Sequence, residues 1–193
     1  DGVGVTWRSV DLHDVYAVLG IVTTITADHA EDIVRVNVAS GAKLADIGCA
    51  IACMATDATA YYVHPEEHGP PLDREPLTEG VADVEVLPSY PVETPTTDQV
   101  AILDHVQEAT TAAYTPKKSD LIAFSEDEQL SYMAEADPAN DKAKFALLNT
   151  HIVEPLVERE YIRVESVGRQ KQITLTATGE NALKAFRHKL REQ

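Results

Sequence analysis

A short turn near the start of the chain carries residue types suited to binding an anion. The run from Asn37 to Lys43 follows an apolar stretch at residues 33–36 and precedes a helical pattern that begins at Leu44. The first N–H groups of a helix have no partner within the helix, and Lys43 adds a positive charge beside them. Small residues are also needed at such a junction for purely steric or capping reasons, so two interpretations stay open. If an anion binds, we expect a phosphate-bearing ligand held by Asn37, Ala39, Ser40, Gly41 and Lys43.

Basic residues gather in the C-terminal quarter of an otherwise acidic chain. The formal net charge is -16, and residues 1–96 hold 4 Lys and Arg against 16 Asp and Glu. Residues 142–193 reverse the balance, with 10 basic and 6 acidic side chains. Such a contrast marks the segment where DNA would lie, although an ordinary solvated face has the same composition. The candidate DNA-contacting residues are Lys142, Lys144, Asn149, Thr150, His151, Arg169 and Lys171.

Other reactive side chains are less well placed. Cys49 and Cys53 lie four residues apart on one expected helix, and we expect small buried side chains rather than a disulfide or a four-ligand metal site. A redox-sensing pair of thiols is the alternative. His64, Glu66 and His68 fall in a proline-rich segment that offers no fixed geometry for a metal. We therefore assign neither a catalytic residue nor a metal site.

The first half of the chain alternates extended and helical patterns, as parallel α/β sheets do. We expect strands over residues 3–10, 33–39 and 59–63, and helices over residues 11–30 and 43–56. The second helix has Leu44, Ile47, Ile51 and Met54 on a single face. Residues 64–77 contain four prolines and should hold no regular element. Residues 81–87 alternate like an edge or antiparallel strand.

The second half has a helical pattern that ends in a hairpin and a last helix. Capping boxes at Thr96 and Ser125 predict two helix starts, and a further helix covers residues 117–124. The next helix starts near Asp141 and stacks Phe145, Leu148, Ile152 and Leu156, although Pro155 should kink it or force an N-terminal turn beside it. Strands over residues 161–166 and 172–176 enclose a turn with Gly168, and a helix over residues 177–190 follows. This order predicts a winged helix-turn-helix domain.

Length and composition set the wider expectations. We place two domains, at residues 1–92 and 96–193, joined by a proline-rich connector. No window is apolar over the roughly 18 residues that a bilayer crossing needs, so we expect a soluble, cytoplasmic protein without a membrane partner. The chain begins at Asp1, directly before a strand-like stretch, so we expect the first sheet to be incomplete at its N-terminus. The excess of acidic residues over Lys is typical of halophilic, salt-saturated cytoplasm.

The order of these features resembles the CARF (CRISPR-associated Rossmann fold) transcriptional regulators, most closely those of haloarchaea. Residues 36–43, 61–67 and 168–179 carry the resemblance. It implies a Rossmann-like first domain, a homodimer formed through it, a cyclic oligoadenylate-type or other nucleotide-like effector, and transcriptional control by a winged helix on double-stranded DNA. Asn37, Gly41 and Lys43 match the family's strand-end Asp or Asn, turn glycine and basic residue. Ala39 and Ser40 depart from its usual hydroxyl residue and first glycine.

These features together predict a ligand-responsive DNA-binding transcriptional regulator that is not an enzyme and needs no cofactor. One alternative is a ring nuclease that cleaves cyclic oligoadenylates, with Lys43 steadying the phosphate transition state. The other is an interaction adaptor whose winged helix does not contact DNA.

Overall fold

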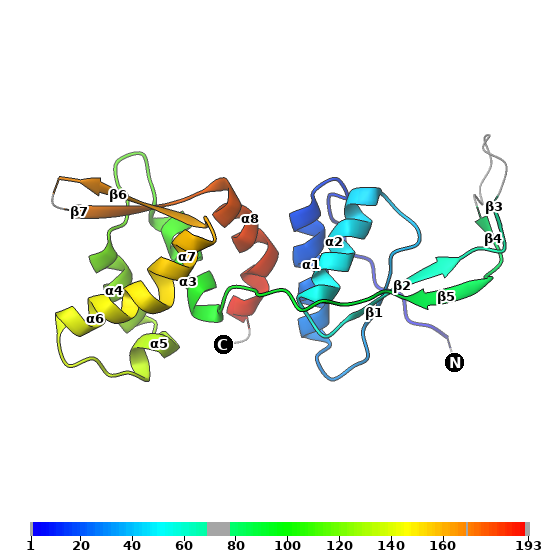
Figure 1. Ribbon diagram of the computed structural model, residues 1–193, viewed down its shortest axis with the longest axis horizontal. Coiled ribbons are helices and arrows are strands. Elements are labelled where there is room, and N and C mark those ends of the chain that lie inside the picture. Colours follow the sequence, from blue (N-terminus) through cyan, green and yellow to red (C-terminus); the bar gives the residue numbers. More distant parts are fainter. Residues whose placement is uncertain (1, 69–77, 169, 192–193) are drawn as a thin grey trace. The chain divides into compact units, whose positions relative to one another are not determined.

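The chain folds as two compact units in the computed structural model (Figure 1). Unit 1 spans Asp1–Glu93 and unit 2 spans Thr94–Gln193. The structure describes residues 2–68, 78–168 and 170–191. The boundary between the units follows Pro88 and Pro91, in a stretch without regular structure where proline removes backbone donors.

Unit 1 is a mixed α/β unit built on a three-stranded sheet. Its elements are α1 (Val15–Asp28), β1 (Arg35–Asn37), α2 (Lys43–Met54), β2 (Thr59–His64), β3 (Glu67–His68), β4 (Thr78–Glu79) and β5 (Asp83–Val86). The strand order is β1-β2-β5, in which β1 and β2 are parallel. β5 is antiparallel to β2, with Val86 opposite Tyr61. The edge or antiparallel strand expected over residues 81–87 is therefore confirmed by β5, which no helical crossover separates from β2, and the sheet as a whole is mixed rather than parallel as expected.

One face of this sheet packs on α2. Val34, Val36 and Val38 alternate toward that face, and Ala60 and Cys53 complete the small core. The expectation that Cys53 is a buried side chain is confirmed, since only 2% of it is exposed. Burial raises the pKa of its thiol to about 11, with a further contribution from Cys49, so Cys53 is not a reactive thiolate.

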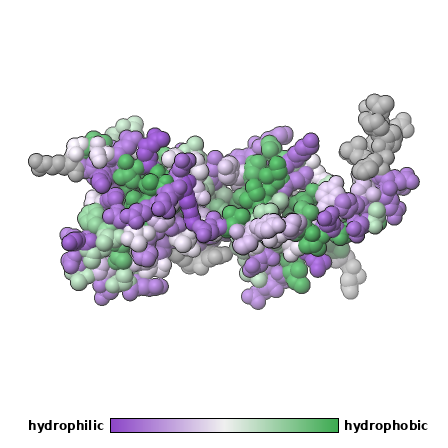
Figure 2. Space-filling model, in the orientation of Figure 1, coloured by the Kyte–Doolittle hydropathy of each residue, from purple (hydrophilic) through white to green (hydrophobic). Residues whose placement is uncertain are grey.

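The two helices of unit 1 pack through their smallest residues. A Cβ placed at Gly48 would lie 2.9 Å from the carbonyl oxygen of Val15, so α2 approaches α1 closely at this glycine. The larger residues on the predicted apolar face of α2 remain outside, with Leu44 42% and Ile47 50% exposed. Hydrophobic side chains accordingly gather at the surface over α1 and α2 (Figure 2).

Three other expectations for unit 1 are wrong. Residues 3–10 form no strand, and Val3 and Trp7 are 92% and 88% exposed, so no strand among the described residues pairs with this stretch. Asp14, rather than Asp11, caps α1, because its carboxylate accepts the N–H of Ala17. Part of residues 64–77 is regular, since β3 and β4 pair with Glu67 opposite Glu79, while residues 69–77 lie outside the described part.

Unit 2 has the element order of a winged helix. Its elements are α3 (Thr97–Ala109), α4 (Lys118–Asp127), α5 (Ser131–Ala134), α6 (Asp141–Leu148), η1 (Asn149–Val153), α7 (Glu154–Glu158), β6 (Ile162–Val167), β7 (Gln170–Leu175), α8 (Ala177–Phe186) and η2 (Arg187–Arg191). β6 and β7 form a hairpin, and Lys117 adds an isolated bridge to Gln172 of β7. Gly168 turns the hairpin at a φ of 63°, a conformation that favours glycine.

α6, η1 and α7 run on without a break, and we call this composite the long helix. Pro155 has no N–H to offer the carbonyl of His151, as a regular helix would require. The side-chain Nε2 of Gln99 donates to that carbonyl instead, over 3.0 Å. Pro155 lies in the first turn of α7, directly after the π-helical segment η1, so the expected N-terminal turn beside Pro155 is confirmed.

A buried carboxylate positions the short helix α5. Asp98 is 7% exposed and accepts hydrogen bonds from the N–H of Ser131, its hydroxyl and the N–H of Tyr132. The predicted capping box at Ser125 is wrong. Ser125 lies inside α4, where its hydroxyl donates to the carbonyl of Leu121 and lies 2.7 Å from the Tyr132 hydroxyl. The capping box of Thr96 and Gln99 at the start of α3 is confirmed.

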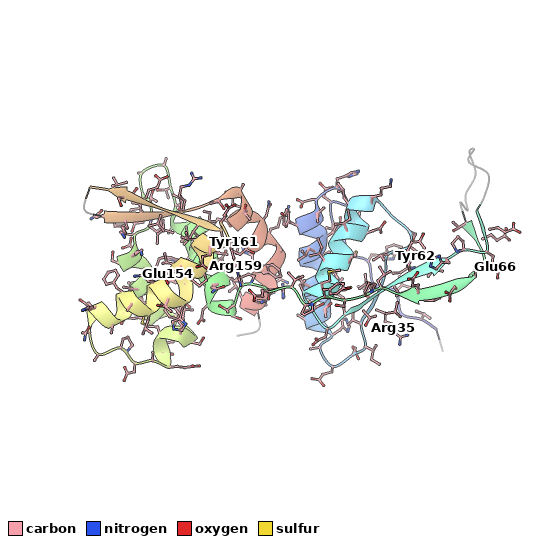
Figure 3. The ribbon with its side chains drawn as sticks, viewed as in Figure 1. Arg35, Tyr62, Glu66, Glu154, Arg159 and Tyr161 are labelled. Atoms are coloured by element: carbon pink, nitrogen blue, oxygen red, sulfur yellow. The ribbon has the colours of Figure 1, made fainter. Side chains whose placement is uncertain are left out.

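The core of unit 2 includes the inner face of the long helix. Leu148, Ile152 and Leu156 are buried as the sequence predicts, but Phe145 is 39% exposed. At the other end of the unit, α8 crosses the start of β6 so closely that a Cβ at Gly179 would lie 1.9 Å from the Tyr161 carbonyl oxygen. Figure 3 shows Arg159 and Tyr161 where α7 passes into β6.

Candidate nucleic-acid interface

Three elements of unit 2 meet around one open cavity of about 470 Å³. They are the start of α4, the middle of the long helix and the first residues of β7. The side chains that line this cavity, which we call the lysine pocket, are Lys117, Lys118, Ser119, Phe145, Asn149, Gln170 and Lys171. This set holds three lysines and no carboxylate, in a chain with twice as many acidic as basic residues.

Lys118 is fixed by a contact with the long helix. Its Nζ donates to Oδ1 of Asn149 over 2.5 Å, which ties α4 to the long helix. Burial lowers the pKa of Lys118, the positive charge of Lys171 lowers it further, and Glu154 opposes both effects. An anion in the pocket would offset the repulsion between Lys118 and Lys171, since a nearby opposite charge favours the charged form of each lysine.

The start of α4 is fixed by Asp120. Its Oδ2 accepts the N–H of Lys117 over 2.8 Å and the hydroxyl of Tyr114 over 2.5 Å. This carboxylate satisfies one N–H at the helix start and fastens the preceding loop to it. The backbone from which Lys117 and Lys118 project is therefore well defined.

The predicted DNA-contacting residues fall into several places. Asn149 and Lys171 line the lysine pocket, while Lys142 is exposed near the start of α6. Lys144 instead pairs with Glu126 of α4. Thr150 and His151 line a separate cavity of about 590 Å³ together with residues that include Asp98 and Glu135. Arg169 lies outside the described residues.

Sequence reasoning missed five residues of the lysine pocket. They are Lys117, Lys118, Ser119, Phe145 and Gln170. The missed signal was the Lys117–Lys118 pair directly before a helix, the one Lys-Lys pair in the sequence. Its meaning depends on tertiary structure, because the pair belongs to the pocket only once the bridge to Gln172 brings α4 against the hairpin.

Several features of the turn from Asn37 to Lys43 in unit 1 favour an anion site, and one feature argues against it. Oδ1 of Asn37 accepts the N–H of Ala39 over 2.8 Å, and Gly41 has a φ of 146°. Lys43, the first residue of α2, is exposed. A Cβ at Gly41, however, would lie 3.2 Å from the carboxylate of Asp46, so a negative charge already stands beside the turn.

Comparison with known proteins identifies unit 2. Residues 98–187 match the family model described as the DUF6293 C-terminal winged helix domain. These residues form a winged helix domain. Such a domain is consistent with DNA binding, and its long helix and hairpin are the elements that commonly contact DNA.

Residues 1–68 match a second family model, HFX_2341_N-like, N-terminal. No curated protein matches the chain. Within the described residues, the helices are too short or too polar to cross a membrane.

Proposed function

We propose that the protein is a transcriptional regulator that binds double-stranded DNA through its winged helix. The observation that carries the proposal is the lysine pocket, in which the start of α4, the long helix and β7 present three lysines to one space. In a chain of net charge -16, random placement of basic residues would seldom leave such a set without a carboxylate among its lining residues. The pocket has the charge that a DNA backbone phosphate requires.

The chemistry of the pocket suits a phosphate in particular. Lys118 and Lys171 supply two positive charges, and the hydroxyl of Ser119, which donates to Oδ1 of Asp120 over a long 3.3 Å, can donate to a phosphate oxygen in its place. Bound phosphate would thus hold the long helix against DNA, because Lys118 links the phosphate site to Asn149.

Charge reversal tests this proposal against the adaptor alternative. Lys118→Glu and Lys171→Glu should each abolish the binding of a fluorescent promoter duplex in an anisotropy titration, while Lys184→Glu on α8 should reduce it far less. The far-ultraviolet circular dichroism of every variant shows whether the fold is retained. Wild-type protein that binds no duplex at low salt would contradict the proposal and favour an adaptor.

For unit 1 we propose an effector site at the turn from Asn37 to Lys43, in a chain that acts as a homodimer. The proposal is supported by the exposed Lys43 and by the Asn37 side chain, which holds the backbone of the turn. Isothermal titration with cyclic tetra-adenylate, cyclic hexa-adenylate and inorganic phosphate tests it. Chromatography of the same mixtures after incubation tests the ring-nuclease alternative, which requires linear products. Sedimentation gives the oligomeric state.

A further inference from the structure

Phe145 is the residue of the lysine pocket that phosphate binding leaves unexplained. It is 39% exposed on the outer side of α6. The other two phenylalanines are covered, since Phe124 stacks on His105 with 4.0 Å between ring centroids and Phe186 is 9% exposed. A large apolar ring among lysines contributes little to a phosphate site, so it needs another partner.

Phe145 and Asn149 form one face of the long helix. They are four residues apart, a spacing that places side chains one above the other on a helix, and both line the lysine pocket. Thr150 and His151 line a different cavity, beside Asp98 and Glu135. The side chains that would meet base edges, when Lys118 and Lys171 meet the backbone, are therefore Phe145 and Asn149.

The orientation of Asn149 is set by Lys118. Because the Lys118 ammonium donates a hydrogen bond to Oδ1 of Asn149, the amide nitrogen Nδ2 points away from that lysine. The free end of the side chain is thus a donor of two hydrogen bonds. In the major groove such a donor meets N7 of a purine, whereas an exposed phenyl ring meets the C5-methyl group of thymine.

We propose that the long helix reads a thymine through Phe145 and a neighbouring purine N7 through Asn149. The two residues are four positions apart, which is about 6 Å along the helix, and base pairs are about 3.4 Å apart, so the two bases lie one or two steps apart. The proposal rests on the DNA-binding function proposed above. It makes Phe145 and Asn149 specificity-determining residues, in contrast to lysines that would bind any sequence.

Altered bases test this proposal without disturbing the fold. A duplex selected for binding by the full-length protein is resynthesised with deoxyuridine in place of each thymine in turn, which removes only the methyl group. One replacement should weaken binding by wild-type protein about fourfold, the effect of exposing one buried methyl group. A 7-deazapurine one or two steps away should weaken it about fivefold, by removal of one hydrogen bond.

Protein variants assign each effect to its residue. The conservative variant Phe145→Leu should bind the thymine and deoxyuridine duplexes with more nearly equal affinity than wild-type protein does. Phe145→Ala should bind the two duplexes with the same affinity. Asn149→Ala should lose sensitivity to the 7-deazapurine. Val157→Ala, at another exposed apolar residue of the long helix, should keep both sensitivities. Equal binding of all altered duplexes by wild-type protein, or full sensitivity in Phe145→Ala, overturns the inference while DNA binding stands. If no duplex binds, the proposed function itself fails.

Discussion

The hydrogen bond from Gln99 to the carbonyl of His151 allows a sharp test of how the long helix is held. Gln99 is 6% exposed, its Nε2 donates to the carbonyl that Pro155 leaves without a helical partner, and its Oε1 accepts the N–H of Thr96. Gln99→Leu keeps the size of the side chain and removes both interactions. Losing this half-buried hydrogen bond costs about 1 kcal/mol, and the weakened capping box adds about 0.5 kcal/mol. We expect a loss of about 1.5 kcal/mol in the free energy of unfolding.

A double-mutant cycle with Pro155→Ala separates this mechanism from general damage to α3. Pro155→Ala introduces an N–H that can donate to the His151 carbonyl in a regular helix. The loss of unfolding free energy caused by Gln99→Leu should therefore be about 1 kcal/mol smaller in the Pro155→Ala background. Urea denaturation followed by circular dichroism at 222 nm measures all four proteins. Gln107→Leu, at an exposed position of the same helix, is the control; it loses a long, exposed hydrogen bond from Arg187 and should change stability by less than about 0.5 kcal/mol. Equal costs of Gln99→Leu in both backgrounds would refute the reasoning.

Three other predictions concern separate parts of the chain. Gly179→Ala should lower the free energy of unfolding in urea by about 3 kcal/mol, because the added Cβ would clash with the Tyr161 carbonyl oxygen. Gly4→Ala, at a glycine with open surroundings, is the control and should be neutral. Equal effects of the two substitutions would contradict the close packing at Gly179. Burial lowers the pKa of His105 below 6.5, only partly offset by nearby carboxylates, so the unfolded chain binds the proton better and stability falls as the pH drops through and below 6.5. His105→Gln should lessen that loss between pH 7.5 and pH 5.5, and an unchanged pH profile would argue against it. Asp46→Asn should tighten the binding of cyclic tetra-adenylate about fivefold in calorimetry, because it removes roughly 1 kcal/mol of repulsion, and unchanged affinity would place the effector elsewhere.

The sequence predicted the elements of unit 2 better than those of unit 1, for a physical reason. The helices and hairpin of a winged helix are separate local patterns, so the Thr96 capping box and the Gly168 turn could be recognised directly. The strand predicted over residues 3–10 depended on a partner, and none of the described residues supplies one. The apolar face of α2 was misplaced because close packing at Gly48 favours small residues, which periodicity in large side chains does not detect.

The candidate interface was predicted only in part. Asn149 and Lys171 could be found from their position in and after the helix that precedes the hairpin, and both line the lysine pocket. Lys118 could not, because its place in the pocket follows from a bridge between Lys117 and Gln172, which are far apart in the sequence. Phe145 was assigned to the core from its helical spacing, but that spacing also fits an outer face.

The salt dependence of DNA binding tests the central claim most directly. Each phosphate contact that a lysine makes should add about 0.9 to the slope of log K against log salt concentration. The double variant Lys118→Gln, Lys171→Gln should therefore bind duplex DNA with a slope smaller than that of wild-type protein by about 1.8, while Lys184→Gln should keep the wild-type slope. A double variant whose slope equals that of wild-type protein would contradict the claim that the lysine pocket holds the DNA backbone.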